Sequence, residues 1–177
     1  SNYIVSADKA VISEIASTPA PSPTPTPSPT PTPQLFTVDD NTTGTGNNQF
    51  EYVGTWGFNA TATCYNSTEH YSGSANSHYN VDFNGTRIRI YGCKDSNMGI
   101  EAYSVDAGSE TNIDCYSASR QDQILLYDSG TLSSGQHTLK MRYTNTKNAS
   151  SSGYYVSADK AVVTLASGAT PTPTPTP

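Results

Sequence analysis

Two stretches of alternating proline limit what this chain can fold into. Residues 18–33 read TPAPSPTPTPSPTPTP, and the chain ends in a second such stretch at 168–177. Each proline fixes its own φ and disfavours helix at the preceding residue, so we expect extended polyproline II linkers that bury no core. In a secreted protein the intervening threonines are O-glycan acceptors, although a bare spacer has the same sequence. The candidate acceptors are Thr24, Thr26, Thr30, Thr32, Thr172, Thr174 and Thr176.

A short segment occurs twice, each time just before a linker. Residues 1–12 read SNYIVSADKAVI and residues 152–163 read SGYYVSADKAVV, with nine of twelve positions identical. Chance duplication is an unattractive explanation, because a Pro-Thr stretch follows both copies. The repeat predicts that residues 1–17 are the C-terminal strand of a preceding module, 18–33 a linker, 34–167 one module and 168–177 another linker. We expect the strand at 1–15 to belong to a neighbouring module's sheet.

Charge and composition narrow the class of protein. Charged residues make up only 14% of the chain, Tyr occurs 12 times and the net charge is −6. Such a composition is typical of a secreted, turn-rich β protein, and it argues against nucleic acid or an anionic membrane surface as partner. The sequence holds no apolar run of the ~18 residues that a membrane helix needs. The predicted location is extracellular or on the cell surface.

Between the linkers the pattern is one of strands and turns. Ile88 and Ile90 alternate with arginines, and Leu139, Met141 and Tyr143 alternate with polar residues, which predicts half-buried antiparallel strands with these side chains inward. Turn residues separate such segments throughout, so the predicted fold is an all-β antiparallel sandwich or jelly roll. The expected strands are Gln34–Val38, Phe50–Phe58, Thr86–Tyr91, Ile100–Val105, Gln123–Tyr127, His137–Tyr143 and Tyr154–Leu165.

Three cysteines, Cys64, Cys93 and Cys115, suggest one disulfide and one remaining thiol. Their spacing matches no zinc pattern. Cys93 and Cys115 each follow an expected strand end, so we predict that these two pair, with Cys64 free or bonded to another chain.

Six short motifs follow one another along the module: Thr68–Ser72, Thr86–Gly92, Ser96–Gly99, Cys115–Gln121, Gly135–Leu139 and Asn145–Tyr154. The series resembles, in order, the galactose-binding-domain-like jelly-roll modules found in carbohydrate-active enzymes and large surface proteins. The resemblance covers nearly all of 34–166 and implies the fold more firmly than a ligand. Cys93 and Cys115 stand where the family pattern leads us to expect a proline and an aliphatic residue, which fits a disulfide that replaces packing.

The resemblance implies a set of candidate sugar-binding residues. Trp56, if exposed, offers a stacking platform for a sugar ring, but its neighbours Val53 and Phe58 favour a core position. Side chains from the Thr68–Ser72 motif and from the loop after Cys115 are expected to line a glycan cleft, with arginine as a bidentate donor. A structural network between the two loops explains them equally well. These candidates are His70, Tyr71, Tyr116 and Arg120.

Other candidate sites carry less signal. Asp39, Asp40 and Asp159 lie at the start and end of the module, where a structural calcium or simple turn capping is expected. We expect no other cofactor. No catalytic arrangement stands out: the spacing of Glu51, Glu69, Glu101 and Glu110 suggests no acid/base pair, so we predict a non-enzymatic module. Five N-glycosylation sequons occur, at Asn41, Asn59, Asn66, Asn84 and Asn148.

Two functions follow from these observations. The first is a structural repeat of a glycosylated, extracellular tandem-repeat or fibril-forming protein, whose partners are neighbouring copies of itself. The alternative is a carbohydrate-binding module attached to a polysaccharide-active enzyme or an adhesin, whose partner is a glycan. The repeat and the linkers favour the first, and the family resemblance favours the second.

Overall fold

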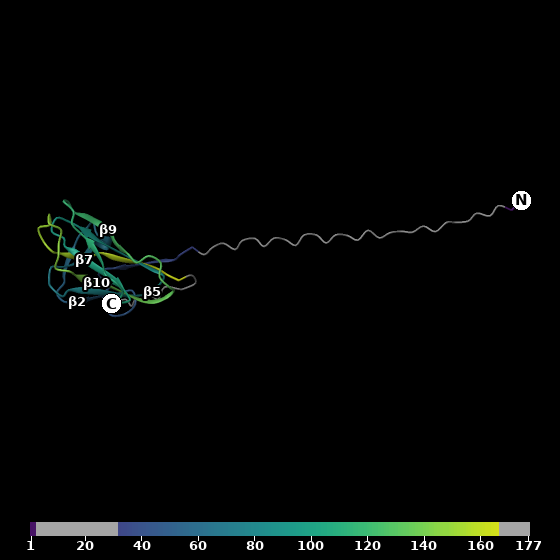
Figure 1. The fold of residues 1–177 in the computed structure, drawn as a ribbon, viewed down its shortest axis with the longest axis horizontal. Coiled ribbons are helices and arrows are strands. Elements are labelled where there is room, and N and C mark those ends of the chain that lie inside the picture. The colour runs from purple at the N-terminus through teal and green to yellow at the C-terminus, as the bar shows by residue number, and fades with distance from the viewer. Residues whose placement is uncertain (3–31, 167–177) are drawn as a thin grey trace. The chain divides into compact units, whose positions relative to one another are not determined.

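The computed structural model describes residues 1–2 and 32–166. The chain divides into two units, Ser1–Thr30 and Pro31–Pro177, and residues 32–166 of the second form a folded β module (Figure 1). One short 3₁₀ helix, η1 (Tyr65–Ser67), accompanies the strands. The strands are β1 (Leu35–Asp39), β2 (Phe50–Val53), β3 (Gly57–Ala60), β4 (Thr68–Ser72), β5 (His78–Gly85), β6 (Arg87–Lys94), β7 (Ile100–Val105), β8 (Thr111–Asp114), β9 (Gln121–Asp128), β10 (Gly135–Tyr143), β11 (Val156–Ala158) and β12 (Lys160–Thr164).

Antiparallel pairing groups these strands into three sheets within the described part of the chain. A four-stranded sheet has the order β1-β12-β6-β9, a five-stranded sheet the order β2-β5-β10-β7-β8, and a three-stranded sheet the order β11-β4-β3. The labels β5, β10 and β7 in Figure 1 mark the middle of the five-stranded sheet. The predicted all-β antiparallel sandwich, consistent with a jelly roll, is confirmed.

The alternation seen in the sequence explains the core. Ile88 and Ile90 in β6 are fully buried, as are Leu139 and Met141 in β10, and Tyr143 is almost so. These side chains join one apolar cluster that also takes residues from β5 and β12. Full burial of such a side chain stabilises the fold by ~1.5–3 kcal/mol, so the paired inner faces account for why the sheets pack together.

Some expected strands have different limits. The predicted strand Phe50–Phe58 is two strands, because Gly54 lies between them with φ +93°, a conformation that favours glycine. Val53 and Phe58 are exposed rather than in the core. The strand expected at 154–165 is also divided: the chain leaves the three-stranded sheet with β11 and enters the four-stranded sheet with β12, and Asp159 stands between.

Asn-Gly is a common hairpin-turn sequence, but Asn84–Gly85 does not form a hairpin turn. β5 pairs with β2 and β10, whereas β6 pairs with β12 and β9, so this segment carries the chain from one sheet to another. Gly85 is required there because a Cβ atom would lie 2.5 Å from the carbonyl oxygen of Thr164.

The strand expected at 1–15 and most of both linkers lie outside the described residues, as do the candidate O-glycosylation sites other than Thr32. Within the described residues, no helix has the length and apolar character that crossing a membrane requires.

Candidate functional site

The strand β4 decides which candidate residues meet. Successive side chains of a strand point to opposite faces. Glu69 and Tyr71 therefore share one face, and Thr68 and His70 share the other. Tyr71 and Glu69 face a hollow of about 270 Å³, whose lining is completed by β3, by the segment after β6 and by residues from distant loops. The lining residues are Asn59, Glu69, Tyr71, Cys93, Asn97, Met98, Arg120 and Tyr155.

A second hollow of about 330 Å³ shares two residues with the first, Tyr71 and Tyr155. Trp56 lines this second hollow together with Thr55, Gly57 and residues 72–74. The rings of Tyr71 and Tyr155 lie edge to face, with centroids 6.1 Å apart. We call the two hollows and their shared rings the Tyr71/Tyr155 site.

Two glycines make room for these rings. A Cβ atom on Gly57 would lie 2.6 Å from the Cζ atom of Tyr71, its cross-strand neighbour. A Cβ atom on Gly73 would lie 2.9 Å from the Cε1 atom of Tyr155. Both rings therefore rest against bare backbone, which fixes their orientation while Tyr155 stays 41% exposed. Held and exposed aromatic rings of this kind are suited to stacking on an apolar or sugar face.

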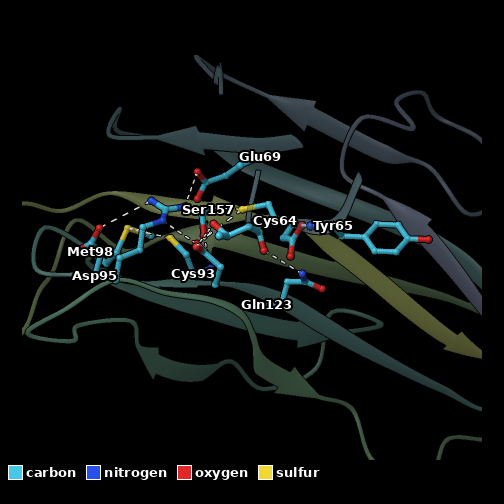
Figure 2. Close-up of polar contacts among 12 residues, drawn as sticks. Cys64, Tyr65, Glu69, Cys93, Asp95, Met98, Gln123 and Ser157 are labelled. Carbon is cyan, nitrogen blue, oxygen red and sulfur yellow. Dashed lines mark hydrogen bonds and ion pairs between the residues drawn. The ribbon is translucent and has the colours of Figure 1, made fainter. Parts of the chain in front are cut away.

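Arg120 and Glu69 form the polar floor of the first hollow. The Nη2 atom of Arg120 donates to Glu69 Oε2 at 2.9 Å, and its Nε atom donates to Asp122 Oδ1 at 2.7 Å. Asp95 stands further off, with Oδ2 3.9 Å from Nη1. Glu69 is only 2% exposed, so this ion pair orients a buried carboxylate beside the hollow. Figure 2 shows Glu69 above Cys64 and Cys93, with Asp95 and Met98 on one side.

The thiols of Cys64 and Cys93, which lie beside this ion pair, are neutral. Burial, reinforced by the negative charge of Glu69, raises the pKa of Cys64 to about 12. The same two causes raise the pKa of Cys93 further above its usual value. Since only a thiolate is a good nucleophile, neither cysteine is activated for covalent chemistry.

The predicted disulfide between Cys93 and Cys115 is not present: all three cysteines are buried, free thiols. Each of the two has its own contact. Cys93 Sγ lies 3.9 Å from Met98 Sδ, whereas Cys115 Sγ lies 3.7 Å from the carbonyl oxygen of Ile113. The two thiols thus fill the core as small apolar side chains.

Of the five predicted sugar-binding residues, three belong to the site and two do not. Tyr71 and Arg120 line the first hollow, and Trp56 lines the second while it packs against Tyr52 and Tyr79. Trp56 is thus partly a core residue, as expected, and partly a wall of the site.

The other two candidates are placed elsewhere. His70 points to the opposite face of β4, where its Nδ1 atom lies 2.6 Å from Asp40 Oδ2 and its ring stacks on Tyr52. Tyr116 lines neither hollow, and its backbone N–H donates to Asp114. Neither residue lines the Tyr71/Tyr155 site.

The candidate calcium ligands come together but are already engaged. Asp40 accepts from Thr68 at 2.6 Å and contacts His70, and Asp159 Oδ1 accepts the backbone N–H of Tyr65 at 2.8 Å. One oxygen each of Asp39 and Asp159 stays buried without a partner. Among the described residues, however, no group of three His, Cys, Asp or Glu side chains is arranged to hold a metal ion. A calcium ion there stays a prediction.

Each of the four glutamates considered for acid/base chemistry contacts a different residue. Glu51 accepts from Asn80, Glu69 from Arg120 and Glu110 from Arg142, while Glu101 is fully buried against Tyr103.

Sequence reasoning missed Tyr155, Glu69, Asn59 and Asn97. The signal for Tyr155 was in the repeat: the first copy has Ile4 at the corresponding position. An aromatic residue that replaces an aliphatic one within an otherwise matching segment indicates a requirement particular to this copy.

Comparison with known proteins supports the fold. No family model matches the chain. A 90-residue stretch is 30% identical to an "A type blood alpha-D-galactosamine galactosaminidase" of Flavonifractor plautii, and it covers 51% of this chain but only 8% of that enzyme. A family two carbohydrate esterase from Cellvibrio japonicus matches 76% of this chain over 35% of its own, at 15% identity and TM-score 0.52. A Paenibacillus xanthan lyase matches 78% of this chain over 14% of its own chain, at 17% identity and TM-score 0.55. This chain is thus similar to β-sandwich portions of larger carbohydrate-active enzymes.

Proposed function

We propose that residues 34–166 form a carbohydrate-binding module that uses the Tyr71/Tyr155 site. One observation carries the proposal: two tyrosine rings, held against glycine backbone, border two hollows, the first of which also contains an oriented ion pair. Sugar-binding sites combine an aromatic platform for the apolar ring face with fixed polar groups for the hydroxyls. The similarity to portions of a galactosaminidase, an esterase and a lyase agrees with this use.

The module is proposed to be non-catalytic and to direct a larger secreted or surface protein to a glycan. The matched stretches cover only small parts of the three enzymes, as an accessory module would. The glutamate contacts described above agree with a binding role, since each carboxylate is engaged by a different partner.

The single tryptophan supplies a test. Trp56 lines the second hollow, so a glycan bound across Tyr71 and Tyr155 is expected to change its fluorescence. Titration with a panel of soluble polysaccharides should give a saturable change for the wild-type protein and none for Tyr71→Ala. Failure of every polysaccharide to alter the fluorescence or to bind by calorimetry would reject the proposal.

A structural, tandem-repeat role is the second candidate, and it does not exclude the first. Its support is the repeated segment, whose second copy forms β11 and β12. Val156, Ala158, Ala161 and Val163 are all fully buried there. The first copy has Val5, Ala7, Ala10 and Ile12 at the corresponding positions, as another module of the same design would. Glycopeptide analysis of native material tests this role, because it reads the repeat length and the occupancy of the linker threonines together.

A further inference from the structure

The charges around the first hollow point to the class of glycan it takes. This inference rests on the proposed function and goes one step further. Arg120 is the one cation among the residues that line the hollow. Three carboxylates surround it: Glu69 and Asp122 by hydrogen bonds, and Asp95 at 3.9 Å. Since the neighbouring thiols are neutral, the cluster as a whole is negatively charged.

Carboxylates of the protein already surround the guanidinium of Arg120. Two of its nitrogens already make short hydrogen bonds to carboxylates. A uronic acid at the third nitrogen, Nη1, would meet the carboxylate of Asp95, which lies 3.9 Å away, and that of Glu69. Like charges at such short range repel, so the site disfavours anionic glycans.

The other groups near Arg120 are carboxylates, aromatic rings and neutral amides. Glu69 lines the hollow and pairs with Arg120 through its Oε2 atom. Asp95 accepts the backbone N–H of Ser96 with Oδ1, while its Oδ2 atom lies 3.9 Å from Arg120 Nη1. The half-buried ring of Tyr71 and the exposed ring of Tyr155 line the hollow, and the π faces of such rings attract an ammonium group. Asn59 and Asn97 add neutral amides for hydroxyl groups.

We propose that the Tyr71/Tyr155 site binds glycans that carry unsubstituted amino groups, with the ammonium beside Glu69, Asp95 and the tyrosine rings. An N-acetylated sugar has lost that charge, and a uronate carries the opposite one. The site then discriminates between sugars of similar shape by charge.

Isothermal titration calorimetry with three probes tests this: a chitosan oligosaccharide, its fully N-acetylated counterpart and an oligogalacturonate. The deacetylated probe is expected to bind roughly tenfold tighter than the acetylated one, which corresponds to about 1.4 kcal/mol, and the acidic probe should not bind. Asp95→Asn is expected to reduce this preference while the protein still folds, since Asp95 is only partly buried. Tyr155→Ile, the residue of the first repeat copy, should remove binding of every probe.

Two controls separate the site from general attraction of a cation to an acidic protein. Glu110→Gln removes a partly exposed carboxylate that pairs with Arg142 outside the site, and it should leave the preference unchanged. Tyr154→Ala removes an equally exposed ring that lines neither hollow. If a neutral or acidic glycan binds best and Tyr155→Ile still abolishes binding, the charge assignment is wrong and the binding function stands. If no glycan binds in a Tyr155-dependent way, the binding function itself is wrong.

Discussion

The side-chain carboxylate of Glu101 in β7 accepts the backbone N–H of Ser157 in β11 at 2.9 Å. This bond joins the five-stranded sheet to the three-stranded one, and the carboxylate also accepts from Tyr103. Burial raises the pKa of Glu101 to about 7, and burial also raises that of Asp159 to about 6. The hydrogen bond to Asp106 raises the pKa of His137 as well.

These three shifts predict that the module is more stable in mild acid than at pH 8. A group whose pKa is higher in the folded state binds its proton more tightly there, so it favours folding below its unfolded pKa and ceases to do so as pH rises through its folded value. For Glu101 and Asp159 that window runs from about pH 4 to 7. Asp128, whose pKa Arg87 lowers to about 2, has the opposite sign. Its contribution is complete above about pH 4 and is lost as pH falls towards 2, so it does not change between pH 5 and pH 8.

Urea unfolding at pH 5 and pH 8 measures this dependence, and each unit of pKa difference contributes about 1.4 kcal/mol. Glu101→Gln imitates the protonated carboxyl and is expected to flatten the fall in unfolding free energy between these pH values. A variant as pH-dependent as the wild type would show that Glu101 titrates normally.

The free thiols give a second prediction. Because Cys64, Cys93 and Cys115 are buried and neutral, the native protein should react slowly with a thiol reagent, and all three should react once it is unfolded without reductant. Detection of one thiol instead of three in the unfolded, unreduced protein would mean that a disulfide forms after all.

The glycine beneath the ring of Tyr155 gives a third prediction. Gly73→Ala should cost little stability, because the side chain it meets is a ring that can move, and the unfolded chain loses entropy. Glycan affinity is nonetheless expected to fall roughly tenfold, about 1.4 kcal/mol, since the ring of Tyr155 must shift. Thermal unfolding alongside calorimetry separates the two effects, and unchanged affinity would show that the ring position is unimportant.

The five sequons give a fourth prediction, on glycosylation. Asn41, Asn59, Asn66 and Asn84 are exposed, whereas Asn148 donates its side-chain amide to Asp114 at 2.6 Å. In a host that modifies sequons, peptide mapping should find the first four occupied and Asn148 less so. Asn59 lines the first hollow, so a glycan attached there should block ligand binding, and Asn59→Gln should restore it. Full occupancy of Asn148 would contradict the importance of that hydrogen bond.

The sequence predicted most of the fold because apolar and polar residues alternate clearly along several strands. β6 and β10 have apolar residues at every second position, and both match their predicted inner faces. β4 was not predicted, because Thr68–Ser72 is polar. Its buried members are Glu69 and Ser72, which bond to Arg120 and to the carbonyl of Thr55, and neither partner is close in sequence.

The site was only partly predictable for the same reason. Tyr71 and Arg120 were both recognised as candidates. That they come close together, however, depends on which strands pair, and the local sequence pattern does not specify that pairing. His70 was grouped with Tyr71 although adjacent strand residues point to opposite faces, so a strand assignment for β4 would have separated them. Tyr155 reaches the site only because β11 pairs with β4.

The binding account is tested most directly by glycan-array screening of three proteins in parallel: wild type, Tyr155→Ile and Tyr154→Ala. Tyr154 and Tyr155 are neighbours of equal exposure, and Tyr155 alone of the two lines the hollows. The account predicts that the wild type and Tyr154→Ala bind the same glycans and that Tyr155→Ile binds none of them. Equal binding by Tyr155→Ile and the wild type would contradict it.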